Sequence, residues 1–386
     1  MEKVKFRLKK PLSSTRIEFI TETLRDSSIS TRLDFHDNHI EYLSQNEEEL
    51  DDLNELLEKL VFISRAVERK RVIVSRTPTL QFLGDPLKSL IDMEEVVKIG
   101  EGLFLFQGQF LKVFKAIDEY LLNIAINEFD AVEQENPILW PMELFRKVNY
   151  LEEFPQQALM VSGLRKERNE LKNFARQHSS KHDFFSISSK KHLADAEVGL
   201  QPAVCDTCYF SLKGRSDIQN VNYTTKNKVF RNEISEHASL DRLMAFTVRD
   251  LIFIGDRNYT LLQRENLIER LIKFFDDTGL NYSIEVADDP FFSGNIEKKY
   301  FQHQFELKYE VLATIPFLGK RIAIGSINLH LDTFSSSLDI KQGCDFVHSG
   351  CVGIGYERLL LALYSQHGTD LSTWPSSLLK ILNLKC

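Results

Sequence analysis

The sequence predicts an α+β protein in which helices flank an antiparallel β-sheet, with a small α/β domain at the N-terminus. From about residue 201 onward, β-branched and aromatic runs alternate with turn residues, a pattern typical of strands that pair with their sequence neighbours. Before residue 80, strand and helix patterns follow the order βαββαβ. We therefore predict two domains, residues 1–80 and residues 81–386.

The pattern of the first 80 residues predicts a ferredoxin-like domain. Asp37-Asn38 is a good turn pair between two short strands, and leucines at helical spacing form an apolar stripe on a long helix. That helix carries acidic residues in its first turn and basic residues at its end, which suits the helix macrodipole. The predicted elements are strands at 3–8, 31–36, 39–42 and 71–75 and helices at 14–24 and 46–68.

In the second domain, apolar periodicity predicts a long helix over residues 107–126, and prolines bracket a short helix after it. Residues 169–182 are polar and basic, which indicates a surface helix or loop. Gly279 is a good C-cap for an amphipathic helix that begins near residue 258. Further predicted elements are strands at 103–106, 244–254, 284–286, 308–314 and 321–331 and helices at 298–307 and 359–364.

Composition excludes several classes of protein. The 386 residues, 43% hydrophobic and 27% charged, suit a soluble globular chain with a sizeable core. A net charge of −8 argues against a large sequence-independent nucleic-acid surface. We expect no membrane span and a cytoplasmic location, because the N-terminus lacks an apolar signal core and no run approaches 18 apolar residues. Five cysteines favour free thiols or metal ligands over disulfides.

A predicted hairpin carries the first chemical signal. Its strands include residues 229–230 and 244–254, and its tip is the polar run 234–241. A guanidinium grips phosphate oxygens bidentately, an aromatic ring stacks on a purine, and a carboxylate accepts its amino protons. An Arg–Glu pair two residues apart is equally compatible with a solvated ion pair. The candidate residues are Arg231, Glu233, Arg242 and Phe246.

The second signal is Gly353-Ile-Gly355-Tyr-Glu-Arg358, which runs into an apolar helix. Glycines let a backbone approach a ligand closely, and the arginine lies at the head of the helix.

A third signal is metal chemistry. Cys205 precedes the hairpin, Asp250 ends its second strand, and Cys351 precedes the glycines. Three such ligands with one open position describe a zinc site, although the cysteines could also be small buried hydrophobes and Asp250 could pair with Arg249. Two other arrangements stay open, a four-thiolate zinc site that adds Cys208 and Cys344 and a redox role for Cys205-x-x-Cys208.

These segments together resemble the amino acid:[carrier protein] ligases, truncated homologues of the atypical, archaeal-type seryl-tRNA synthetases. The order F-R-x-E, R-x-x-x-F and G-x-G-x-x-R is similar to motifs 2 and 3 of class II aminoacyl-tRNA synthetases. A long helix, a strand and a proline before residue 142 resemble motif 1, their dimer element. Matching segments begin at Pro202, Arg249, Asp289, Ser326 and Ser349.

The resemblance implies ATP-dependent formation of an aminoacyl-adenylate and transfer to a phosphopantetheine thiol. Arg231 would hold the α-phosphate, Arg242 and Arg358 the β- and γ-phosphates, and Glu233 and Phe246 adenine. Zn²⁺ on Cys205, Asp250 and Cys351 would bind the amino group, with Asp250 one methylene shorter than the family's glutamate. Arg249, Ser326 and Asn328 would contact the substrate. Mg²⁺ is implied too, although Ala323 stands where the family has an acid.

The implied partners are a carrier protein, a small amino acid and a second copy of the chain, with tRNA unlikely on account of the acidic net charge. A predicted helix with Lys298, Lys299 and His303 would dock the carrier. Competing interpretations are a true aminoacyl-tRNA synthetase, an adenylate-forming amide ligase and an inactive synthetase-like regulatory subunit.

Overall fold

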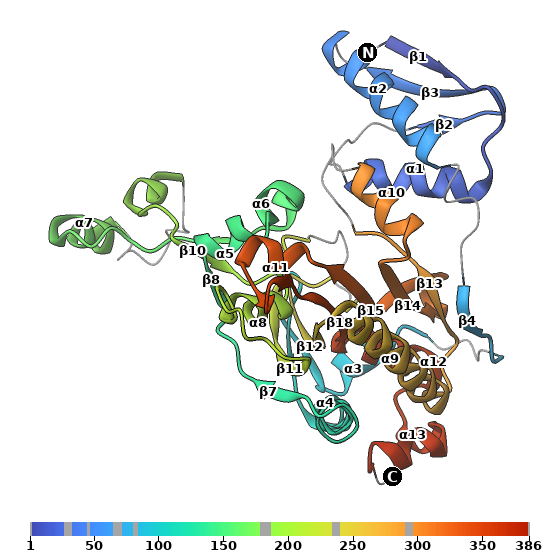
Figure 1. Cartoon of the computed structure of the whole chain (residues 1–386), viewed down its shortest axis with the longest axis vertical. Coiled ribbons are helices and arrows are strands. Elements are labelled where there is room, and N and C mark those ends of the chain that lie inside the picture. The colour runs from blue at the N-terminus through green and yellow to red at the C-terminus, as the bar shows by residue number, and fades with distance from the viewer. Residues whose placement is uncertain are drawn as a thin grey trace.

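The computed structural model describes residues 2–26, 33–44, 47–64, 72–79, 84–177, 187–233, 240–289 and 296–384. Two parts of unequal size are visible in Figure 1. The smaller, at the N-terminal end, is a three-stranded sheet with two helices. The larger is built on an eight-stranded sheet, and it holds the hairpin and the glycine-rich run.

The smaller part confirms most of the predicted N-terminal elements. Its sheet has the order β1-β3-β2, and the helices bury apolar side chains such as Ile20, Ile40 and Leu57 against one face. Predicted segments within 27–32 and 65–71 lie outside the described residues. The elements are β1 (Glu2–Arg7), α1 (Ser14–Asp26), β2 (Asp34–Phe35), β3 (His39–Ser44) and α2 (Glu47–Ile63).

The predicted closing strand of the ferredoxin-like domain pairs differently from what the sequence predicted. β4 (Val72–Arg76) does form, but it pairs with β13 (Tyr282–Val286) at the edge of the large sheet and not with the N-terminal sheet. Ile73 and Val74 pack on the large core, and Arg76 Nε lies 3.0 Å from Asp276 Oδ1. The N-terminal part is therefore βαββα. The chain enters the large sheet before residue 80, and the domain boundary stays a proposal.

The large sheet is antiparallel throughout, except where β7 pairs parallel with β11. It confirms the predicted antiparallel architecture, including the hairpin of β11 and β12. The order is β4, β13, β14 (Lys308–Ile315), β15 (Lys320–Leu331), β18 (His348–Gly355), β12 (Ala245–Gly255), β11 (Val221–Phe230) and β7 (Val132–Gln134).

Three long helices pack against one face of this sheet, α4 (Gly108–Asn127), α9 (Arg257–Thr278) and α12 (Tyr356–His367). Local sequence explains the limits of α9. The Asp256 side chain accepts a hydrogen bond from Tyr259 N at the start, and Gly279 takes φ 67° at the end, a conformation that suits glycine. Together these helices and the sheet bury the main apolar core.

Short elements and loops cover the other face of the sheet and leave room for a cavity. Near it lie α5 (Met142–Lys147), α6 (Tyr150–Glu153), α8 (Cys205–Ser211), α10 (Ile296–Gln304) and α11 (Thr333–Leu338). α10 also contacts α2 of the N-terminal part. The other elements include α3 (Pro86–Asp92), α13 (Ser376–Ile381), the β5–β6 hairpin (Val96–Gly100, Leu103–Phe106) and the small sheet of β8 (Leu139–Pro141), β9 (Met160–Val161) and β10 (Val198–Leu200).

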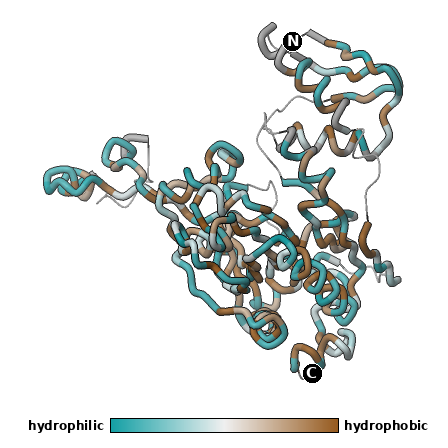
Figure 2. Tube along the Cα trace, viewed as in Figure 1, coloured by the Kyte–Doolittle hydropathy of each residue, from teal (hydrophilic) through white to brown (hydrophobic). Residues whose placement is uncertain are grey.

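The polar segment expected at 169–182 is helical over α7 (Arg168–Gln177), and residues 178–186 lie outside the described ones. α7 extends away from the sheet, and the hydrophilic colour of this projection contrasts with the apolar centre of the large part (Figure 2). Among the described helices, none is long and apolar enough to cross a bilayer.

Candidate active site

A cavity of about 780 Å³ opens on the sheet face that bears α8 and α11. This volume suits a nucleotide-sized or drug-sized ligand. Most of the predicted site residues line it, although they come from segments far apart in the sequence. They are Cys205, Arg231, Glu233, Phe246, Asp250, Ser326, Asn328, Cys351 and Arg358.

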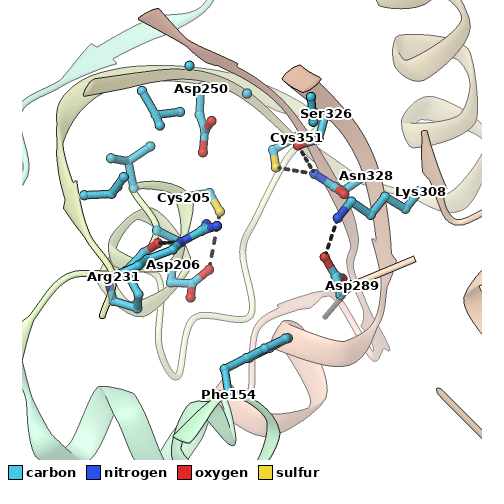
Figure 3. A pocket seen from close by; sticks show the side chains of 18 of the residues that line it. Phe154, Cys205, Asp206, Arg231, Asp250, Asp289, Lys308, Ser326, Asn328 and Cys351 are labelled. Carbon is cyan, nitrogen blue, oxygen red and sulfur yellow. Dashed lines mark hydrogen bonds and ion pairs between the residues drawn. The ribbon is translucent and has the colours of Figure 1, made fainter. Parts of the chain in front are cut away.

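Strand register brings the predicted metal ligands together. Asp250 of β12 pairs with Gly353 of β18, so Cys351, two residues earlier, shares its face of the sheet. Cys205 comes from the first turn of α8. The ligand atoms of all three side chains lie within 4.8 Å of one another, and Figure 3 shows them directed toward the same space.

Gly353 makes room for Asp250. A Cβ atom at position 353 would lie 2.5 Å from Asp250 Oδ1, closer than any stable contact. The glycine therefore has a packing role here, because only a residue without a side chain lets the carboxylate lie across the neighbouring strand.

The electrostatics of this cluster favour a cation. Burial raises the pKa of Asp250 well above its usual value. The adjacent Cys205 side chain, together with His330 and Asn328, holds the pKa of Cys351 well below its usual value. Two thiols and a carboxylate are a donor set that Zn²⁺ accepts, with one position open. The residues present thus fit a zinc ion.

The four-thiolate alternative finds no support in the described residues. Cys208 is buried in an apolar cluster beneath α8, and Cys344 is exposed. Neither belongs to a group of ligand atoms within 4.8 Å among the residues that the structure describes. All four described cysteines are free thiols, so no disulfide joins Cys205 to Cys208.

The hairpin residues form the other end of the cavity. Arg231 lies at the end of β11, where its Nε donates to Pro202 O at 3.2 Å. Its guanidinium carbon lies 5.5 Å from the centre of the Phe246 ring. A cation over an aromatic face is held in a defined position. The hairpin tip at 234–239 lies outside the described residues.

Arg358 reaches this end from the first turn of α12. Its Nε donates to Asp241 O at 2.7 Å, its Nη1 donates to Ala323 O at 3.3 Å, and its Nη2 lies 3.9 Å from Glu233 Oε2. Burial lowers the pKa of Arg358. A half-buried guanidinium bonded mainly to neutral carbonyls remains available to an anion.

Glu357, which the sequence did not single out, connects the two motifs. Its Oε2 accepts from Thr247 N at 2.8 Å, and its Oε1 accepts from Thr247 Oγ1 at 3.0 Å and from Lys228 Nζ at 2.9 Å. The side chain is only 1% exposed. It therefore ties the strand that carries Phe246 to the helix that carries Arg358.

Comparison with known proteins agrees with this geometry. The class II core domain of tRNA synthetases (G, H, P, S and T) matches residues 185–367. An amino acid–[acyl-carrier-protein] ligase of Bradyrhizobium diazoefficiens is 31% identical over 62% of this chain and 72% of its own length. The chain belongs to this ligase family, on a class II synthetase core.

Archaeal seryl enzymes are related more distantly. A type-2 serine–tRNA ligase of Methanothermobacter thermautotrophicus is 23% identical over 82% of this chain and 63% of its own length. The solved M. kandleri SerRS, in complex with A. aeolicus tRNASec, has a TM-score of 0.72 at 19% identity, covering 99% of this chain and 77% of that one. That likeness shows that the ligase has the class II fold.

Two predicted contacts of this ligase differ in the structure. Arg249 does not line the cavity, because it points to the opposite face of β12 from Asp250. It is buried there against Asp118, with Nη2 to Oδ1 at 2.8 Å, and donates to Thr224 Oγ1 at 3.2 Å. We therefore do not assign Arg249 a contact with the substrate. Arg242 is exposed and outside the lining, close enough to Arg358 to contribute to its lowered pKa.

The sequence reasoning also missed residues of the ligase cavity. Asp206, directly after Cys205, accepts from the Cys205 thiol at 3.3 Å, and burial raises its pKa to about 6. His330 Nε2 lies 3.8 Å from Cys351 Sγ, while its Nδ1 meets Tyr209 OH at 3.1 Å. Two signals were available in the sequence: Asp206 adjoins a predicted ligand, and His330 ends the matching segment that begins at Ser326.

A buried ion-pair group forms the wall nearest α10. Lys308 Nζ lies 2.7 Å from Asp289 Oδ1 and 3.2 Å from Glu310 Oε1. The Gln302 side chain binds Asp289 twice, donating to its Oδ2 and accepting from its backbone N. The predicted segment that begins at Asp289 is thereby attached to the cavity wall, as Figure 3 shows for Asp289 and Lys308.

Proposed function

We propose that this ligase activates a small amino acid with ATP and transfers it to the phosphopantetheine thiol of a carrier protein. One observation carries the proposal: two arginines, Arg231 and Arg358, share a single cavity with a cluster of three side chains that could hold a metal ion. The first group suits ATP, and the second suits the amino group of an amino acid. Relatives named amino acid–[acyl-carrier-protein] ligases support the acceptor.

In the first step a carboxylate oxygen attacks the α-phosphorus, and the bond to the β-phosphate breaks as pyrophosphate leaves. Arg231 would hold the α-phosphate and Arg358 the outer phosphates, so that both neutralise charge that develops on the oxygens. Phe246 would stack on adenine, and Glu233 would accept its amino protons. Arg242, exposed beside Arg358, would reach the outer phosphates from the rim.

Cys205, Asp250 and Cys351 would hold the zinc ion, which when bound provides a position for a free α-amino group. Ser326 and Asn328 lie on the same cavity wall, and Asn328 Nδ2 lies 3.1 Å from Ser326 Oγ and 3.6 Å from Cys351 Sγ. These two side chains would orient the carboxylate near the cluster.

A carboxylate for Mg²⁺ is available despite Ala323. Glu310 of β14 pairs in register with Ser326 of β15, and both line the cavity. Carboxylate and hydroxyl oxygens are the ligands that Mg²⁺ prefers. Glu310 would therefore provide the acid that position 323 lacks, after exchanging its ion pair with Lys308.

In the second step the carrier thiol attacks the adenylate carbonyl, the C–O bond to AMP breaks, and the thiol gives up its proton. α10 lies at the cavity rim, where Lys298, Phe301 and Gln302 line the opening. Phe301 and Phe305 are exposed, with ring centres 4.5 Å apart. We propose that this face and Lys298 receive the acidic carrier.

Two residues of the predicted docking set differ from expectation. Lys299 is 2% exposed, so it packs inside and does not offer charge to a partner. His303 is half-buried, and burial lowers the pKa of its ring. Lys298 alone remains at the surface, paired with Glu153.

A homodimer through the motif 1 region stays part of the proposal. The β5–β6 hairpin exposes Val97, Ile99, Leu103 and Leu105, of which Ile99 is 68% exposed. Contiguous exposed apolar side chains of this kind mark protein interfaces. We also propose the cytoplasmic location expected from the sequence.

The experiment has two stages. Amino-acid-dependent ATP–pyrophosphate exchange across a panel of amino acids should identify one or a few small substrates. Mass spectrometry of holo-carrier proteins and acid-gel analysis of tRNA should then show the amino acid on the carrier only.

A second outcome is favoured by one specific observation, the fold likeness to M. kandleri SerRS over 99% of the chain. Efficient tRNA charging without any mass gain on holo-carriers would place the chain among tRNA synthetases and overturn the carrier proposal.

A further inference from the structure

The outer face of the N-terminal sheet carries a second group of metal-ligand atoms. His36, His39 and Glu41 each place one such atom within 4.8 Å of the others. The group lies on the β2–β3 hairpin, in a part of the chain separate from the cavity (Figure 1).

Hairpin geometry accounts for the arrangement. His36 N donates to His39 O at 2.9 Å, so these two residues close the Asp37-Asn38 turn and their side chains share a face. The two rings are stacked, with centroids 4.5 Å apart. Glu41 follows His39 by two residues on the same strand and therefore lies on that face as well.

Distances within the group suit one ion. His39 Nε2 lies 3.4 Å from Glu41 Oε1, and His36 Nε2 lies 4.0 Å from Glu41 Oε2. Bonds of about 2.0–2.2 Å from zinc to nitrogen and oxygen place tetrahedral ligand atoms about 3.4 Å apart. Small side-chain rotations would bring the three atoms to that spacing, since the His36 side chain is 48% exposed.

The hydrogen bond at the far side of His39 defines its tautomer. Nδ1 meets Asn38 Oδ1 at 2.6 Å, and because an amide oxygen only accepts, Nδ1 carries the proton. In the neutral ring Nε2 then presents a lone pair to the Glu41 carboxylate. A divalent cation between these two acceptors would satisfy both, and an imidazole fixed through its other nitrogen is the usual form of a metal ligand.

We propose that His36, His39 and Glu41 bind a divalent transition-metal ion of the Zn²⁺ class. Two imidazoles and a carboxylate select Zn²⁺, Co²⁺, Ni²⁺ or Cu²⁺ over Mg²⁺ and Ca²⁺. The ion joins the two ends of the β2–β3 turn and so stabilises the N-terminal part. Lys5 competes with the ion for the Glu41 carboxylate, because Lys5 Nζ lies 3.0 Å from Glu41 Oε1.

The test is Co²⁺ titration of the metal-stripped full chain, followed by optical absorption. Thiolate ligation gives sulfur-to-cobalt charge-transfer bands, whereas a site of two histidines and a glutamate gives none. We expect the site of His36, His39 and Glu41 to bind one equivalent of Co²⁺ that adds no such bands. This holds whether or not the cysteine cluster also binds Co²⁺. His39→Gln should abolish this equivalent, and Asn38→Ala should weaken it by about 10-fold.

Lys5→Met is the matched control, since it removes the competing cation and should tighten binding. Circular dichroism verifies that each variant is folded. Equal Co²⁺ stoichiometry and affinity in the parent chain and in His39→Gln would overturn the proposal and leave a proton as the shared cation. An affinity that does not respond to Lys5→Met would show that Glu41 is not a ligand and would overturn the three-ligand site.

Discussion

Arg249 and Asp250 are neighbours on β12, yet they belong to two different environments. Arg249 faces α4, where Asp118 Oδ1 lies 2.8 Å from its Nη2 and where Tyr356 OH accepts from its Nε at 3.3 Å. Asp250 faces the cavity, where burial raises its pKa and no basic side chain pairs with it among the described ion pairs. The charge of Arg249 is satisfied internally, whereas the carboxyl group of Asp250 is left for a ligand.

The difference teaches how one sheet provides both stability and function. A buried ion pair with several hydrogen bonds resists the loss of either partner. Carboxylates and thiols whose pKa values are perturbed by burial and by one another are typical of binding or catalytic sites. Changes on the α4 face should therefore alter stability, and changes on the cavity face should alter activity at nearly constant stability.

Arg231→Ala should have the largest effect on activity. Loss of a charge-assisted phosphate contact should lower amino-acid-dependent pyrophosphate exchange by about 100-fold or more. The melting temperature should hardly change, because among the described residues the Arg231 side chain has a backbone hydrogen bond and a ring contact to lose. Arg242→Ala, outside the cavity lining, is the control with a smaller expected effect. Pyrophosphate exchange near the parental rate in folded Arg231→Ala would contradict the assignment of Arg231 to catalysis.

Cys351→Ser should remove both the zinc ion and amino-acid activation, because it deletes one of three ligands. Elemental analysis should find about one zinc per chain less in Cys351→Ser than in the parent. Cys344→Ser, at an exposed position, should keep the ion. Zinc release from both Cys344→Ser and Cys208→Ser would support the four-thiolate site instead.

Asp118→Asn should lower the free energy of unfolding by about 3 kcal/mol, because it removes the nearer of the two carboxylates that pair with buried Arg249. Denaturant unfolding measures this, with the exposed neighbour Glu119→Gln as control. A normal stability for Asp118→Asn would contradict the stabilising role of the α4 face.

The same variant predicts a pH dependence. Burial raises the pKa of Asp118, but the Lys226 hydrogen bond and the Arg249 charge outweigh it, and the net pKa is below the ordinary 3.8. Its stabilisation is thus fully present above pH 3.8 and is lost as the pH falls further. The stability difference between parent and variant should stay constant near neutral pH and shrink in acid.

Gly353→Ala tests the close approach on the cavity face. The Cβ atom of the alanine would lie 2.5 Å from Asp250 Oδ1 and would displace that oxygen. Zinc affinity should fall by about 10-fold to 100-fold, as for other changes that disturb ligand orientation. Gly355→Ala is the matched control, since the nearest atom to its Cβ is 3.8 Å away. Equal affinities in the two variants would show that Asp250 is not a ligand.

Lys298→Glu should have the smallest effect. Reversing one exposed charge at the cavity rim should slow transfer to the carrier a few-fold, mainly at low salt, and should change pyrophosphate exchange much less. Lys172→Glu, on the distant helix α7, is the control. A transfer rate that is insensitive to Lys298→Glu at low salt would argue against docking on α10.

The sequence by itself determined the local structure and the chemistry of the site. Hydrophobic periodicity predicted α4, α9 and the strands β12, β13, β14 and β15 of the large sheet, since burial acts on each segment's own pattern, but it predicted neither β7 nor the central strand β18. The spacing of Arg231, Glu233, Phe246 and Arg358 pointed to a nucleotide, and these residues do share one cavity. Strand alternation also contained the correct answer for Arg249, because neighbours on a strand cannot face the same ligand.

Only the tertiary structure decided which surfaces meet. The pattern of residues 72–76 specifies a strand but not its partner, and β4 joined β13 because that edge of the large sheet offered both hydrogen bonds and an apolar face. Helical spacing did not reveal that Lys299 turns inward while Lys298 stays outside. Asp206 and His330 meet the Cys205–Cys351 cluster through side-chain packing across distant segments, and such contacts have no periodic signature in the chain.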